Sequence, residues 1–169
     1  MNRLDRIVVV DLTPEYYGGL GNNLTYRNWN LDFLFQFVKQ QWYSPHYYFS
    51  SPGVFSNQPT SVSNHYPEYS DSATVQQYTS GDNGDALYAQ DYYTQSDKII
   101  VDASYIRLKS MSLHYSLPSE WSKTFSGKVY LQGQNILTLT RYQGVDPETH
   151  SIYYLPPLRQ FTLGIQLEF

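Results

Sequence analysis

Apolar and polar residues alternate with a period of two in segments of about ten residues, and this pattern constrains the fold more than any other feature. The end of the chain is the clearest case, because an apolar set and a hydrophilic set interleave there. The first set is Arg159, Phe161, Leu163, Ile165, Leu167 and Phe169, and the second is Gln160, Thr162, Gly164, Gln166 and Glu168. Successive side chains of a strand point to opposite faces, so this segment is predicted to be a strand with one apolar face.

Four earlier segments show the same alternation, whereas helical spacing is poor throughout. They are residues 20–26, 29–37, 106–117 and 129–140. In the third, Ile106 and Leu108 have the opposite parity to the residues after them, and a β-bulge near Lys109 would restore the faces. In the fourth, Asn135 and Ile136 fall on the wrong faces. The sequence therefore predicts an all-β fold with five antiparallel strands.

The connections between these segments alternate in length. Arg27-Asn28 and residues 118–127 are short, while residues 39–103 and 141–157 are long. Aromatic residues collect at the segment ends, with Tyr26, Trp29, Tyr115, Trp121 and Phe169 towards the short connections and Tyr16, Tyr105 and Tyr142 towards the long ones. Transmembrane β-barrels combine short and long connections with two aromatic girdles in this way. A soluble β-sandwich that buries the apolar faces is the alternative.

Composition excludes several classes of function. The net charge of −4 leaves no basic excess for a nucleic acid partner, and the absence of cysteine excludes thiol chemistry and disulfides. The longest apolar run, Ile7–Val10, is far shorter than the roughly 20 residues of a transmembrane helix. No secretory signal follows Met1, so either the protein is cytoplasmic or this is not the original N-terminus.

The segment from Gln40 to Asp97 is long and polar, with no Lys or Arg and with twelve aromatic residues among 58. Tyr and Trp side chains can stack on sugar rings, so this segment offers weak candidates for ligand contact. These candidates are Trp42, Tyr47, Tyr48, Tyr66 and Tyr69. The alternative is a surface loop that packs on itself and covers a barrel mouth or a partner.

Candidate catalytic and metal-binding groups are few. The four histidines are dispersed without a metal-ligand spacing, and Asp82-Asn83-Gly84-Asp85 is interpreted as a turn because it lacks the register of a calcium loop. Asp146 and Glu148 lie in Val145-Asp146-Pro147-Glu148, which has the composition of a turn. We expect no catalytic residue, no metal site and no cofactor.

The longer motifs resemble the C-terminal barrel of SusC/RagA-type TonB-linked outer-membrane transporters. The resemblance rests on residues 105–118, 129–138, 144–148, 157–159 and 161–169, taken in this order. Residues 13–22 and 30–33 are similar to the preceding strand pair of the same family. The resemblance covers nearly the whole chain, and residues 40–97 are its least diagnostic part.

The resemblance implies that the chain corresponds to the last five strands of an outer-membrane barrel of about 22 strands with a plugged lumen. It further implies import of glycans or oligopeptides, a SusD-type surface lipoprotein as partner, and energy from the TonB complex. Residues 39–103 and 141–157 would be extracellular loops. A plug domain, a TonB box and a signal peptide are not found in this sequence.

Site roles follow from the same resemblance. The barrel-assembly signal is assigned to Phe169, supported by Leu167 and Ile165. The lumen-facing candidates are Gln132, Gln134, Thr138, Thr162, Gln166 and Glu168. Five strands cannot close a barrel, so we expect the chain alone to be an incomplete barrel without transport function.

Overall fold

The computed structural model describes residues 8–64, 76–118, 120 and 125–169. The chain forms two compact units: residues 13–41 with 102–169, and residues 1–12 with 42–101. None of the helices in the described part of the chain combines the length and apolar character needed to cross a membrane.

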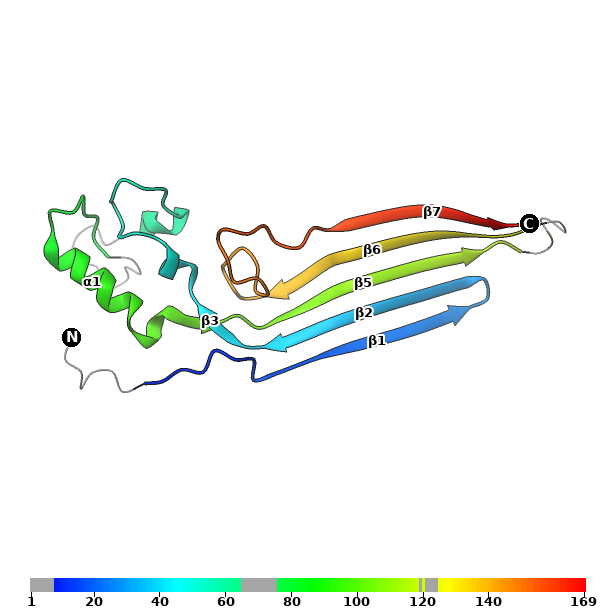
Figure 1. Ribbon diagram of the computed structural model, residues 1–169, viewed down its shortest axis with the longest axis horizontal. Helices are drawn as coiled ribbons and strands as arrows, with labels where there is room; N and C mark the ends of the chain where they lie inside the picture. The colour runs from blue at the N-terminus through cyan, green and yellow to red at the C-terminus, as the bar shows by residue number, and fades with distance from the viewer. Residues whose placement is uncertain (1–7, 65–75, 119, 121–124) are drawn as a thin grey trace. The chain divides into compact units, whose positions relative to one another are not determined.

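The first unit is one antiparallel sheet of five strands in the order β1-β2-β5-β6-β7, which lie side by side in Figure 1. The strands are β1 (Tyr16–Tyr26), β2 (Trp29–Lys39), β5 (Tyr105–Ser116), β6 (Ser126–Thr140) and β7 (Gln160–Glu168). All five predicted strands are present, and β1 begins at Tyr16, before the first residue of the alternating segment. Each strand pairs with the strand before it in the sheet through a continuous register, broken only at one bulge.

The predicted bulge is at Lys109. The pairing of β5 with β6 skips Lys109 on one strand and Asn135 and Ile136 on the other. Asn135 has a φ of 50°, in the left-handed region that Asn tolerates better than most residues. The bulge brings Ile106 and Leu108 onto the same face as the later apolar residues of β5, so the change of parity in the sequence is explained.

One face of the sheet is apolar across all five strands. The register aligns a row of leucines, which is Leu24, Leu31, Leu113, Leu131 and Leu163. Phe161, Leu163 and Ile165 on β7 are 65%, 74% and 68% exposed, so nothing in the described part of the chain covers them. A soluble β-sandwich requires these side chains to be buried, and their exposure counts against that alternative.

The second unit contains more regular structure than the sequence predicted. Strands β3 (Gln41–Tyr43) and β4 (Ile100–Asp102) form a separate two-stranded sheet. The helices are η2 (Pro45–Tyr48), η3 (Thr60–Asn64), α1 (Gly84–Thr94) and η4 (Asp97–Ile99).

The interpretation of Asp82-Asn83-Gly84-Asp85 as a turn was wrong in part, because it begins a helix. Asn83 is the N-cap of α1, and its side-chain oxygen accepts a hydrogen bond of 3.2 Å from the amide of Ala86.

Candidate functional site

The polar face of the five-stranded sheet carries all six residues predicted to face a lumen. The register pairs Gln132 with Thr162 and Lys128 with Gln166, and it places Thr138 opposite Arg107. The six, from β6 and β7, are Gln132, Gln134, Thr138, Thr162, Gln166 and Glu168. The geometry therefore groups them on one face, opposite the apolar residues, and their role as lumen lining stays a prediction.

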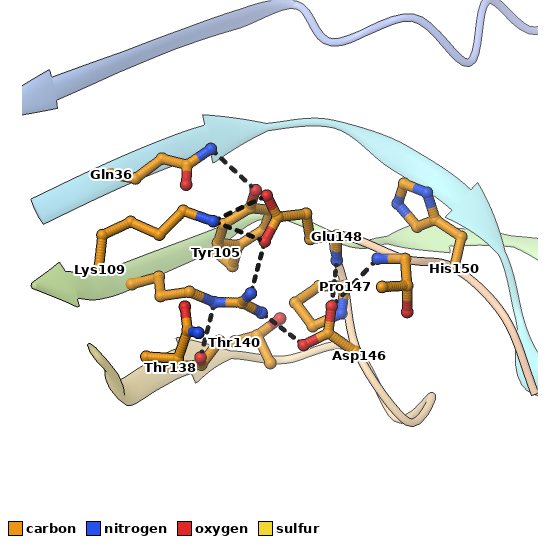
Figure 2. A network of polar contacts seen from close by, with 12 residues as sticks. Gln36, Tyr105, Lys109, Thr138, Thr140, Asp146, Pro147, Glu148 and His150 are labelled. Carbon is orange, nitrogen blue, oxygen red and sulfur yellow. Dashed lines mark hydrogen bonds and ion pairs between the residues drawn. The ribbon is translucent and has the colours of Figure 1, made fainter. Parts of the chain in front are cut away.

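Arg107 is the centre of a polar network on this face, shown in Figure 2. It lies on β5 and is only 1% exposed. Its guanidinium group donates to the carboxylates of Asp146 and Glu148, and its Nε donates to Thr138 Oγ1 at 3.0 Å. The guanidinium carbon lies 5.3 Å from the ring centre of Tyr105, within cation–π distance. A buried cation is stable here because two carboxylates compensate its charge.

Lys109 extends the network from the bulge. Its Nζ lies 3.0 and 3.1 Å from the two carboxylate oxygens of Glu148, so Glu148 binds both basic side chains of β5. On the other side, Gln36 of β2 donates to the hydroxyl of Tyr105 at 3.2 Å. Two cations and two anions thus form a neutral cluster on the polar face, near the end of the sheet where β5 begins and β6 ends.

The acidic members of the cluster belong to a turn between β6 and β7. Asp146 Oδ1 accepts the backbone amides of Glu148 at 2.9 Å and Thr149 at 3.0 Å, while its Oδ2 binds Arg107. The predicted turn is confirmed, since one carboxylate oxygen closes it. Its attachment to the sheet was not foreseen, although the available signal was two basic residues two apart, Arg107 and Lys109, matched by two acidic residues with the same spacing.

A second anchor of the same turn involves His150 and Gln40. The amide nitrogen of Gln40, a residue only 5% exposed, donates to Pro147 O at 2.6 Å and lies 2.8 Å from His150 Nε2. Because an amide nitrogen only donates, His150 Nε2 accepts, which requires the neutral ring with its proton on Nδ1. Burial lowers the pKa of His150, and this effect is larger than that of the negative charges of Asp146 and Glu148, which raise the pKa. We name residues 146–150 the anchored turn.

Three of the five aromatic residues predicted towards the short connections lie in a row at one end of the sheet. Tyr26 pairs with Trp29, and Trp29 pairs with Tyr115, with the ring centres of Trp29 and Tyr115 4.7 Å apart. Of the other two, Trp121 lies outside the described residues and Phe169 follows the end of β7. At the opposite end, the prediction was wrong for Tyr105 and Tyr142, which are 5% and 7% exposed and therefore do not form an accessible girdle.

The aromatic candidates of the second unit pack on one another. The ring of Tyr47 stacks on Tyr43 at 4.4 Å, and Trp42 Nε1 donates to the hydroxyl of Tyr48 at 3.4 Å. Tyr66 and Tyr69 lie outside the described residues. These contacts support the interpretation of a segment that packs on itself.

The end of β7 is uncovered. Ile165 and Leu167 lie on its apolar face, and Phe169 follows the strand with 94% of its surface exposed. Their role as an assembly signal stays a prediction. In the part of the chain that the structure describes, no three His, Asp or Glu side chains lie close enough together to hold a metal ion.

The first unit is an open antiparallel sheet with one uncovered apolar face and one polar face that is hydrogen-bonded. A sheet of this kind is a segment of an amphipathic β-sheet protein.

No family model matches the chain. It is 25% identical over 187 residues to TonB-dependent receptor P3 of Formosa agariphila, covering 98% of this chain and 17% of the relative. It is 29% identical over 163 residues to TonB-dependent receptor SusC of Bacteroides thetaiotaomicron, covering 89% and 15%.

Solved structures agree with the sequence comparisons. The RagAB peptide importer in its closed-closed state matches with a TM-score of 0.71 and 25% identity, over 93% of this chain and 17% of the other. Its open-open state matches with a TM-score of 0.66 and 24% identity, over 94% and 17%. The chain is homologous to SusC/RagA-type TonB-dependent receptors, a family of non-enzymatic transporters, and it spans only 15–17% of the length of the relatives named above.

Proposed function

We propose that the chain supplies the last five strands of the transmembrane barrel of a TonB-dependent importer in the bacterial outer membrane. The observation that carries this proposal is the apolar face of the sheet, which runs through all five strands and is uncovered. A lipid bilayer is the environment that stabilises such a face, whereas water does not.

Strand length supports the same assignment. β1, β2 and β7 have 11, 11 and 9 residues, and a tilted transmembrane strand needs about 9–11. In this arrangement the row of Tyr26, Trp29 and Tyr115 forms part of an interfacial girdle. Residues 39–103 and 141–157 are the extracellular connections.

The polar face then lines the lumen. Six side chains of β6 and β7 contribute hydrogen-bonding groups to the passage, namely Gln132, Gln134, Thr138, Thr162, Gln166 and Glu168. The anchored turn lies over the same face and narrows the passage from the inside. Glycans or oligopeptides are the proposed substrates, and a SusD-type surface lipoprotein and the TonB complex are the proposed partners of the complete transporter. Phe169, with Leu167 and Ile165, is the proposed signal for barrel assembly.

A chimaera tests the proposal. This chain replaces the homologous segment of the Bacteroides thetaiotaomicron SusC, and outer-membrane assembly is measured as the heat-modifiable folded form. Assembly of a folded chimaera supports the proposal, whereas degradation of every chimaera, with junctions varied over the turns, contradicts it.

Two neighbouring substitutions in that chimaera test the assignment of the faces. Leu163→Arg puts a charge on the apolar face and is expected to cost about 2–4 kcal/mol if the residue lies near the bilayer midplane. Thr162→Arg, on the polar face of the same strand, is the matched control and should assemble normally. Equal tolerance of both variants would contradict the assigned faces.

A further inference from the structure

A cavity in the second unit has features of a binding site. It has a volume of about 160 Å³. Its described lining comes from three helices and the connections between them, namely His46, Phe49, Ser50, Pro52, Val62, Gln76, Ala89, Gln90 and Tyr93. None of these lining residues is Asp, Glu, Lys or Arg, so the lining favours an uncharged ligand.

Local hydrogen bonds fix the segment that carries Gln76 to the cavity wall. The hydroxyl of Tyr78 donates to Val62 O at 3.0 Å, and the amide of Thr79 donates to Pro52 O at 2.9 Å. The acceptors of both bonds, Val62 and Pro52, line the cavity. These bonds hold Tyr78 and Thr79, which closely follow Gln76 in the chain, against the cavity wall.

The side-chain amide of Gln76 is the unusual feature. Both its oxygen and its nitrogen are buried from solvent, and neither has a hydrogen-bond partner among the described residues. A buried amide without partners is unfavourable, and such groups are rare in folded proteins. A ligand that fills the cavity and bonds to both atoms would remove this cost.

We propose that this cavity is a binding subsite for an uncharged group that presents a hydrogen-bond donor and an acceptor side by side. The Gln76 amide supplies the matching acceptor and donor. Neighbouring hydroxyls of a sugar ring and a carboxamide share this chemistry, while Phe49 and Tyr93 supply apolar ring surface next to it. The inference concerns residues 42–101 alone and does not rest on the transporter proposal.

Saturation-transfer NMR on the folded SusC chimaera that carries this chain, in detergent micelles and with unmodified SusC as the reference, tests the subsite. The probes are methyl glucoside, acetamide and acetate, the last being an acetamide analogue with a charge and without a donor. We expect transfer to methyl glucoside or to acetamide, and the probe that responds identifies the source of the group. Transfer to neither, or equal transfer to acetate, would overturn the proposal.

Two neighbouring glutamines provide a matched pair of variants. Gln76→Leu is expected to weaken binding of the responding probe about tenfold, because both hydrogen bonds are lost. Gln77→Leu changes the same residue type at an exposed position and should leave binding unchanged. If Gln76→Leu perturbs the far-UV circular dichroism spectrum, Gln76→Glu replaces it, since a carboxylate lacks the donor. Equal binding by the Gln76 and Gln77 variants would overturn the assignment of Gln76.

Discussion

At the scale of single residues, the sheet tolerates a buried arginine because its charge is compensated locally. Arg107 and Asp146 are 1% and 7% exposed in their side chains, whereas the Lys39–Asp102 pair, at 3.4 Å, is 34% and 48% exposed. Removing one partner of a buried pair leaves an unpaired charge, while an exposed pair contributes little. An Asp→Asn substitution is therefore expected to reduce stability much more in the Arg107–Asp146 pair than in the Lys39–Asp102 pair.

Asp146→Asn should release the anchored turn. The loss of charge compensation is expected to cost about 3–5 kcal/mol, which corresponds to opening of the turn roughly a hundredfold to several thousandfold more often. The rate of proteolytic cleavage within residues 143–150 of this chain, measured in the folded SusC chimaera, is expected to rise. Asp102→Asn is the control and should change stability by less than about 1 kcal/mol. Similar cleavage of wild type and Asp146→Asn would contradict the buried role of this pair.

His150 makes the anchored turn dependent on pH. Burial places the pKa of His150 in the folded state below 6.5, the ordinary value of a histidine side chain. The unfolded state therefore binds more protons below pH 6.5, so the stabilising contact is fully present above that pH and is lost as the pH falls. When the ring of His150 is protonated, its Nε2 becomes a donor that faces the amide nitrogen of Gln40, which is also a donor, so the hydrogen bond between them is lost.

Proteolysis of residues 143–150 should accelerate when the pH falls from 7.5 to 5.5. His150→Gln keeps a polar side chain without this titration and should flatten the profile. A profile that is equally steep in the variant would assign the pH dependence to another group.

The sequence was sufficient to predict the turn at residues 145–148 but not its anchoring. Pro147 and the side chain of Asp146 define the turn locally. The contact between Asp146 and Arg107 joins residues 39 apart, and it depends on the register of β5 against β6. A single sequence contains no information on that register beyond the alternation of each strand.

At the scale of elements, period-two alternation predicted all five strands of the sheet and missed the helix α1. The strands are predictable because each has one apolar face. Helix α1 buries only Ala86, so its sequence shows no apolar stripe with helical spacing. Its only local signal was the N-cap residue Asn83.

The bulge at Lys109 predicts a contrast between a deletion and an insertion in β5. Lys109 is the extra residue, because Leu108 and Ser110 pair with the consecutive residues Phe35 and Leu34 of β2, so deleting Lys109 leaves Ile106 and Leu108 on the apolar face. Inserting an alanine between Arg107 and Leu108 instead turns Ile106 to the polar face and Arg107 to the apolar one. We expect the deletion to preserve assembly of the SusC chimaera into its heat-modifiable form and the insertion to abolish it.

Lys109→Gln is the matched control for the deletion. It keeps the register and loses only a half-exposed ion pair with Glu148, for which we expect a loss of no more than about 1 kcal/mol. Equal yields of folded chimaera from the deletion and the insertion would contradict the assignment of Lys109 as the extra residue of β5.

At the scale of the whole molecule, the five-stranded sheet leaves two kinds of surface unsatisfied. Its apolar face is uncovered, and β1 and β7 are edge strands with one row of unpaired backbone groups each. Detergent covers an apolar face but offers no hydrogen bonds, and each unpaired backbone group in an apolar phase costs several kcal/mol. Covering the face alone therefore does not stabilise the sheet.

Residues 1–169 expressed alone are thus expected to aggregate in buffer and to give no heat-modifiable monomer in detergent. Far-UV circular dichroism and sedimentation, with and without detergent, measure both outcomes. A detergent-dependent monomer would mean that the two edges pair with each other. A soluble monomer with a cooperative melting transition in plain buffer would mean that the apolar face is buried in solution, and it would favour the β-sandwich over the barrel wall.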